Sequence, residues 1–208
     1  WLRRETEGER AVGLLLPSSV GGALANVATS LAGKIAVNLN FTAGADAMAH
    51  AVAACEVRTI VTSKQFLAKA GLAEMPGMVF LEDILPTVVR PAAALGTLVM
   101  SLLFPTRALL HFAGCATTRC DGTATVIFSS GSTGAPKGVV LTHRNILSNL
   151  DGIEQIIEFT HGDVLMGVLP FFHSFGYTGT MWFPLTSGFG VVFHPKPKPR
   201  CLHSVFRS

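Results

Sequence analysis

The first third of the chain alternates short apolar runs with stretches of helical periodicity. Residues 11–16 (AVGLLL) form a continuous apolar run closed by Pro17, which is typical of a buried strand. Ser18 or Ser19 can cap a following helix, and Gly33 can end it. The apolar positions of this helix recur at helical spacing: Val20, Leu24, Val27 and Leu31. The pattern therefore predicts a buried strand followed by a helix.

Two further strands are predicted at residues 35–39 and 59–63, where apolar positions are again contiguous. Between them, Thr42 precedes a helix that runs to Cys55. Strands and helices that alternate in short steps are typical of parallel sheets with helical cover. We therefore predict an α/β fold with parallel or mixed sheets, in which residues 1–85 form a first lobe.

The alternation breaks after Leu85, where prolines interrupt an apolar stretch. Residues 92–104 carry no charge, but a helix that spans a bilayer needs about twenty apolar residues. This stretch predicts a buried or surface-lying helix. Residues 86–122 are interpreted as an apolar connection between two lobes.

The pattern resumes in a second lobe at residues 123–195. Thr142 can cap the helix of this lobe. Residues 196–208 have no periodicity and predict an irregular tail. The elements expected in the second lobe are strands at 124–128, 139–141 and 164–169, a helix over 144–157, and a helix and strand within 178–193.

The loop after the strand at 124–128 carries the chemistry. Residues 129–138 (SSGSTGAPKG) combine hydroxyl side chains, three glycines and one lysine. Glycines allow backbone N–H groups to converge on an anion, hydroxyls add donors, and a lysine supplies a mobile positive charge. An ordinary P-loop is excluded, because Pro136 and Gly138 flank Lys137 and strand-forming residues follow. The segment predicts a polyphosphate site between two strands.

The residues 125–146 (TVIFSSGSTGAPKGVVLTHRNI) closely resemble the signature of the adenylate-forming superfamily, which includes acyl-CoA synthetases, luciferases and adenylation domains. The resemblance implies the large N-terminal domain of such an enzyme. It also implies that the loop holds the β- and γ-phosphates of ATP while a carboxylate attacks the α-phosphate. The implied ATP-binding residues are Ser129, Ser130, Gly131, Ser132, Thr133, Gly134 and Lys137, with Thr133 and Lys137 catalytic.

A second segment, residues 169–176 (LPFFHSFG), resembles the next motif of the superfamily, in which an aromatic residue or histidine lines the acyl pocket. The resemblance implies a catalytic or gating role for His173 and substrate contacts from His173, Ser174, Phe175 and Gly176. A general base is not required, because carboxylates are already ionised at neutral pH. The remaining histidines show no spacing typical of metal ligands, so no metal-binding residues are predicted.

Across nearly the whole chain, up to about Pro195, the sequence is most similar to one group. This group is the acyl-ACP synthetase domain of bacterial bifunctional 2-acylglycerophosphoethanolamine acyltransferase/acyl-ACP synthetases. The similarity implies a fatty acid substrate, ATP and Mg²⁺ as cofactors, acyl carrier protein as acceptor, and phospholipid reacylation at the cytoplasmic face of the bacterial membrane. Two alternatives stay open: a fatty acyl-CoA ligase, and a non-catalytic relic or interaction module.

Composition supports part of this interpretation. The chain is 49% hydrophobic and only 14% charged, which fits a surface covered by more protein or by a membrane. Its net charge of +3 includes no dense basic block, which argues against nucleic acid. Four cysteines without metal spacing are interpreted as reduced thiols of a cytoplasmic protein.

The later motifs of the superfamily, which supply adenine, ribose and Mg²⁺ contacts and a C-terminal lysine, are not found in these 208 residues. Holding pyrophosphate is only part of transition-state stabilisation. We therefore expect the isolated chain to bind nucleotide weakly and to turn over little or nothing.

Overall fold

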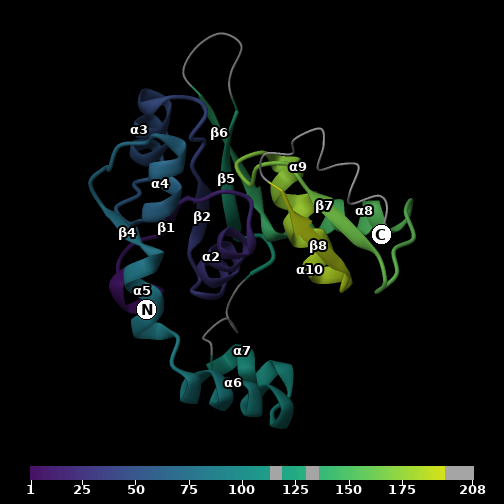
Figure 1. Ribbon diagram of the computed structural model, residues 1–208. Coiled ribbons are helices and arrows are strands. Elements are labelled where there is room, and N and C mark those ends of the chain that lie inside the picture. The colour runs from purple at the N-terminus through teal and green to yellow at the C-terminus, as the bar shows by residue number, and fades with distance from the viewer. Residues whose placement is uncertain (113–118, 130–135, 195–208) are drawn as a thin grey trace.

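The computed structural model describes residues 1–112, 119–129 and 136–194. It contains a six-stranded sheet of order β4-β3-β1-β2-β5-β6 (Figure 1). Its neighbouring strands are parallel except for β5 and β6, which pair antiparallel. The mixed sheet confirms the predicted α/β fold. The strands are β1 (Ala11–Leu15), β2 (Ile35–Asn38), β3 (Ile60–Thr62), β4 (Met78–Phe80), β5 (Thr123–Ser129) and β6 (Lys137–Thr142).

Strand β1 lies near the middle of this sheet, and all five of its residues are buried. Successive side chains of a strand point to opposite faces, so Leu14 and Leu15 belong to different layers of the core. The layer that contains Leu15 packs against α3 (Ala45–Ala54) and α4 (Lys64–Ala70). The layer that contains Leu14 packs against α2 (Val20–Leu31) and the short α1 (Leu2–Glu5). The central strands thus have helical cover on both faces.

Helix α2 forms as predicted, with the Ser19 hydroxyl accepting a hydrogen bond from the Gly22 N–H at 3.1 Å. Its apolar stripe does not face the sheet: Val20 and Leu24 are mostly exposed. The buried face consists of small and polar residues, namely Gly22, Ala25, Asn26 and Thr29. Gly22 has no room for a side chain, because a Cβ there would lie 2.4 Å from the carbonyl oxygen of Pro17, in the turn before the helix, and 3.2 Å from the ring of Phe171.

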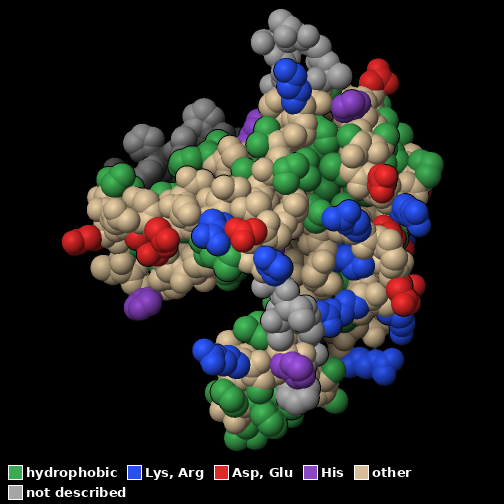
Figure 2. Space-filling view, turned by 180° about the vertical axis from the view of Figure 1, so that it is seen from behind, with side chains coloured by type: hydrophobic (Ala, Val, Ile, Leu, Met, Phe, Trp, Pro, Cys, Tyr) green, Lys and Arg blue, Asp and Glu red, His purple; other side chains and the backbone are tan. Residues whose placement is uncertain are grey.

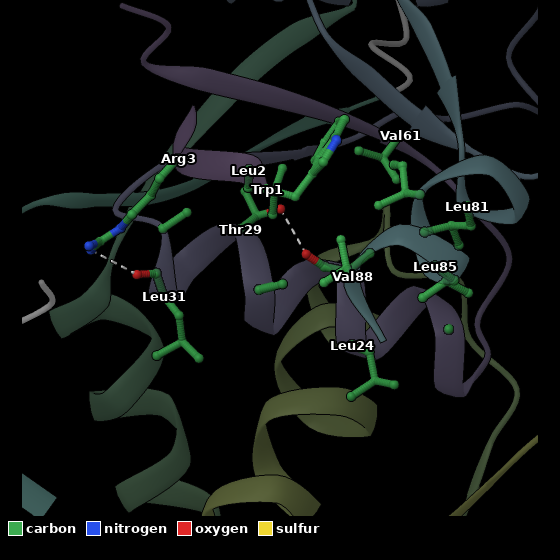
Figure 3. A pocket seen from close by; sticks show the side chains of 15 residues that line it. Trp1, Leu2, Arg3, Leu24, Thr29, Leu31, Val61, Leu81, Leu85 and Val88 are labelled. Carbon is green, nitrogen blue, oxygen red and sulfur yellow. Dashed lines mark hydrogen bonds between the residues drawn. The ribbon is translucent and has the colours of Figure 1, made fainter. Parts of the chain in front are cut away.

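The outward stripe of α2 instead borders an apolar cavity of about 490 Å³ (Figure 3). Leu24 points into it from α2, and Leu85 and Val88 point into it from α5 (Leu81–Val88). Arg3 at its rim donates a hydrogen bond to the Leu31 carbonyl oxygen at 3.3 Å. The cavity also reaches the sheet, because Val61 of β3 and the buried Ala25 and Thr29 of α2 line it.

Helix α5 continues past Leu85 through Pro86 to Val88. Pro86 lies inside this helix, where it cannot donate the backbone hydrogen bond to residue 82 that a helix of other residues would have. Two helices follow, α6 (Pro91–Leu103) and α7 (Thr106–Phe112), and no residue of α6 is buried. Figure 1 shows both helices standing apart from the sheet. We call α6 and α7 the helical arm.

A test of length and hydropathy finds no single helix in the described ranges that could cross a membrane. Helices α5 and α6 pass that test only as a pair, bent by 69°.

After the hairpin of β5 and β6, Thr142 caps α8 (His143–Glu154) with a capping box completed by Asn145. Helix α8 begins one residue before the predicted range of 144–157 and ends three residues before its end. The elements after it include a parallel pair of strands that forms a second, two-stranded sheet. These elements are β7 (Val164–Gly167), α9 (Ser174–Tyr177), a π-helical turn (Thr178–Trp182), α10 (Phe183–Ser187) and β8 (Gly190–Phe193).

Strands β5 and β6 belong to the same sheet as β1 to β4, although they were assigned to a second lobe. The boundaries at residues 85, 122 and 195 stay a prediction. The predicted tail, residues 196–208, lies outside the described residues.

Candidate phosphate-binding site

The candidate phosphate loop connects β5 to β6. The two strands pair antiparallel up to Phe128 with Gly138 and Ser129 with Lys137. This strand–loop–strand arrangement confirms the context predicted from the sequence and excludes the strand–helix context of an ordinary P-loop. Five of the predicted ATP-binding residues lie outside the described residues: Ser130, Gly131, Ser132, Thr133 and Gly134.

The two predicted residues that are described, Ser129 and Lys137, stand opposite each other where the strands end. The Ser129 hydroxyl donates a long hydrogen bond to the Lys137 carbonyl oxygen at 3.5 Å. The side chain of Lys137 is exposed, and its ammonium has no ion pair within the described part of the chain. An ammonium without a neighbouring carboxylate can bind a phosphate group.

The root of the hairpin packs against the segment that follows β2. Ser129 and Pro136 border a small hollow together with Asn40 and Ala43. Phe128 meets the ring of His50 from α3 edge to face, with 6.3 Å between ring centroids. Strand β5 runs parallel to β2, so the carboxyl ends of both strands lie at one edge of the sheet. Ligands bind outside this edge in open α/β sheets.

The second motif, residues 169–176, is fixed to the same edge. The Ser18 hydroxyl, just after β1, donates to the Leu169 carbonyl oxygen at 2.9 Å. Phe172 meets Phe41, which follows β2, edge to face at a centroid distance of 5.1 Å. Residues more than a hundred positions apart in the chain are thereby held together. The described ends of the first motif and the second motif therefore lie at the carboxyl edge of β1, β2 and β5.

His173 directly precedes α9 and is exposed. Its ring is tilted by 54° against that of Phe172, with 4.9 Å between centroids. Ser174 and Phe175 are also exposed. Gly176 is buried, and a Cβ there would lie 2.0 Å from the Pro170 carbonyl oxygen. Gly176 allows a close approach of two backbone segments, and the predicted substrate contacts of all four residues stay a prediction.

The sequence interpretation missed the residues that anchor these motifs, above all Ser18, Asn40 and Phe41. Their positions in the sequence could have indicated this role, because residues that directly follow parallel strands lie at the edge of the sheet where ligands bind. Among the described residues, no three His, Cys, Asp or Glu side chains gather in a way that could hold a metal ion.

Residues 1–207 match the family described as AMP-binding enzyme, and the chain belongs to this family of ligases. Over 78 residues the chain is 38% identical to the long-chain-fatty-acid–CoA ligase of Bacillus subtilis (strain 168). This match covers 36% of this chain and 14% of that ligase. Over 199 residues it is 28% identical to 4-coumarate-CoA ligase 1 of Narcissus pseudonarcissus, covering 88% of this chain and 33% of that protein. The chain thus spans a third or less of either relative.

Solved structures share the fold. The o-succinylbenzoate coenzyme A synthetase of Bacillus subtilis, in complex with AMP, superimposes with a TM-score of 0.73 at 21% identity. The match covers 96% of this chain and 47% of that one. A second complex of that synthetase, with ATP and magnesium ion, gives a TM-score of 0.72 at 21% identity, covering 96% and 48%. The described fold is therefore that of part of the N-terminal domain of adenylate-forming enzymes.

Proposed function

We propose that the protein activates a fatty acid with ATP and transfers the acyl group to the thiol of acyl carrier protein. In the first step a carboxylate oxygen attacks the α-phosphorus of ATP, the bond to the β-phosphate oxygen breaks, and pyrophosphate leaves. The observation that carries this proposal is the Lys137 ammonium at the mouth of the β5–β6 hairpin, which forms no ion pair with any residue that the structure describes. It stands beside a loop sequence of glycines and hydroxyl residues.

Each residue has a part in this step that follows from its chemistry. Lys137 neutralises charge on the β- and γ-phosphates, both when ATP is bound and as pyrophosphate departs. Ser129 and the loop hydroxyls, including Thr133, add hydrogen bonds to phosphate oxygens. His173, exposed at the same edge of the sheet, lines the acyl pocket and orients the carboxylate.

Magnesium would reach the site with the phosphates of ATP, whose oxygens are ligands that it prefers. The described residues offer no cluster of three ligands for it. We therefore assign no step of the reaction to the metal.

The proposal has two forms, which differ in the thiol that accepts the acyl group. The resemblance of nearly the whole chain to acyl-ACP synthetases favours acyl carrier protein, within phospholipid reacylation at the cytoplasmic face of a bacterial membrane. A fatty acyl-CoA ligase is the alternative, and the name of the Bacillus relative supports it. Acyl transfer by the whole protein, offered each acceptor in turn with a labelled fatty acid, distinguishes the two.

A non-catalytic relic or interaction module is a candidate of a different class. The apolar residues exposed on α2 and α6 support it, because such surfaces mark sites of contact with other molecules. This candidate predicts a folded chain that does not bind ATP.

Calorimetry of Mg-ATP binding to the folded chain tests the proposal. Lys137→Ala should weaken binding about ten- to hundredfold, because a charge-assisted contact is lost. Lys69→Ala is the matched control, since Lys69 is an exposed lysine at the end of α4. Equal affinity of the two variants would contradict the assigned role of Lys137. A folded chain that fails to bind ATP would favour the relic.

A further inference from the structure

The helical arm leaves an apolar helix uncovered. Leu95, Leu98, Val99 and Leu102 are spaced along one stripe of α6, and each of their side chains is between 43% and 77% exposed. Helix α6 carries no charged residue, although none of its thirteen residues is buried. A helix that is hydrophobic all round is normally covered by other protein or by lipid.

The charges around the arm indicate which of the two covers it. No acidic residue occurs between Asp83 and Asp121, so all thirteen acidic residues of the chain lie outside the arm and its connections. The same stretch contains Arg90 directly before α6 and Arg107 in α7, both exposed. Neither arginine forms an ion pair within the described ranges. Figure 2 shows basic side chains beside the hydrophobic side chains of this projecting part.

The dimensions of the arm decide how it meets a bilayer. The thirteen residues of α6 extend about 20 Å, whereas the hydrocarbon core is about 30 Å thick. A helix of this length fits in the plane of the interface, with its apolar stripe in the acyl region and arginines at the headgroups. Each arginine near an anionic surface adds attraction that uncharged lipid does not supply.

We infer that the helical arm docks the protein on an anionic lipid bilayer, with Leu95, Leu98, Val99 and Leu102 inserted and Arg90 and Arg107 on the headgroups. This inference specifies the surface for the membrane contact proposed above and rests on that part of the proposed function. Its evidence is independent of the β5–β6 hairpin, whose Ser129 and Lys137 ends lie far from the arm on the other side of the sheet's centre (Figure 1).

Co-sedimentation of the full chain with vesicles tests the inference. Vesicles of equal parts phosphatidylglycerol and phosphatidylcholine should bind the chain, and vesicles of phosphatidylcholine alone should bind it much more weakly. Leu98→Glu with Leu102→Glu should abolish binding. Arg90→Gln and Arg107→Gln should each weaken it about fivefold, as expected for one basic residue at an anionic surface.

Ile156→Glu is the matched control, because Ile156 is an exposed apolar residue outside the arm, and it should bind like the unchanged chain. Insertion has a direct readout as well: the fluorescence of Leu102→Trp should shift to the blue on anionic vesicles. Equal vesicle binding by the Leu98/Leu102 variant and the control would overturn the inference. So would self-association of the chain that these two substitutions abolish without any binding to vesicles, which would assign the arm to a second copy.

The same samples separate this inference from the proposed enzyme function. The Leu98/Leu102 variant should bind Mg-ATP as the unchanged chain does, because α6 is remote from the β5–β6 hairpin. ATP binding without vesicle binding would overturn only the role of the arm. Vesicle binding without ATP binding would overturn only the proposed catalysis.

Discussion

Strand β1 and helix α6 are both uncharged apolar segments, and the fold treats them in opposite ways. Every residue of β1 is buried between two layers of helices, and no residue of α6 is buried at all. Hydrophobic residues leave water wherever a suitable surface is available. An apolar segment therefore shows that it needs cover, and only the remaining structure shows whether this chain supplies it. The predictions below test whether the contrast holds in solution.

The largest expected difference in stability is between two leucine-to-alanine variants, one in the buried strand β1 and one in the exposed helix α6. Leu15→Ala should lower the free energy of unfolding by about 2–5 kcal/mol, because Leu15 is completely buried and a cavity would remain. Leu102→Ala should change it by no more than about 0.5 kcal/mol, because its side chain is mostly exposed. Urea unfolding of the full chain measures both. A cost above about 1 kcal/mol for Leu102→Ala would show that α6 is covered in solution.

The sequence predicted best those features that can be recognised from residues within a few positions of one another. The apolar run at β1, the cap at Ser19 and the cap at Thr142 all have such a local pattern, and all three were confirmed. The face of α2 was not predictable in this way. Its buried face includes Gly22, where a Cβ would lie 3.2 Å from the ring of Phe171, and a neighbour so distant in the sequence leaves no signal in the local periodicity.

The candidate site likewise combines features that the local sequence predicts with contacts between distant residues that it does not. The strands on either side of the phosphate loop were predicted from the local pattern, and the structure adds their antiparallel pairing. The contact of Ser18 with Leu169 joins residues 151 positions apart, and Phe41 with Phe172 is similarly distant. No local periodicity reports such pairs. The family resemblance placed both motifs in one site, and the structure supplies the contacts that hold the second motif to the sheet.

Substitution of two glycines by alanine should change the free energy of unfolding in opposite directions. Gly176→Ala places a Cβ 2.0 Å from the Pro170 carbonyl oxygen, so the segment that carries His173 must shift, at a cost of about 1–3 kcal/mol. Gly96→Ala in α6 meets no atom within 4 Å and should stabilise the helix by about 0.5–1 kcal/mol.

Thermal unfolding of the two glycine variants beside the unchanged chain measures both effects. Destabilisation by Gly96→Ala would mean that another surface packs closely on α6, and the contrast with the buried strand would fail. Tolerance of Gly176→Ala would mean that the loop before α9 is not held against Pro170.

The smallest effect concerns the root of the helical arm, where a carboxylate in α5 holds the start of α4. Glu82 accepts hydrogen bonds from the Ser63 hydroxyl at 2.7 Å and from the N–H groups of Lys64 and Gln65 at 3.1 and 3.3 Å. Desolvation acts to raise the pKa of Glu82, but these hydrogen bonds outweigh it and lower the pKa from 4.5 to about 2.

Because the pKa of Glu82 is lower in the folded state than in the unfolded state, its stabilising contribution is fully present above pH 4.5 and is lost as the pH falls through about 2. The carboxylate is exposed, so solvent screening limits the contribution to about 1 kcal/mol or less. Glu82→Gln should therefore lower stability slightly at neutral pH and flatten its dependence on acid, measured by urea unfolding at a series of pH values. The control Glu158→Gln changes an exposed carboxylate outside this contact. If both variants keep the pH dependence of the unchanged chain, Glu82 does not hold α5 to α4, and the ion pair of Lys64 with Asp83 at 2.7 Å is left as the charged contact between these two helices.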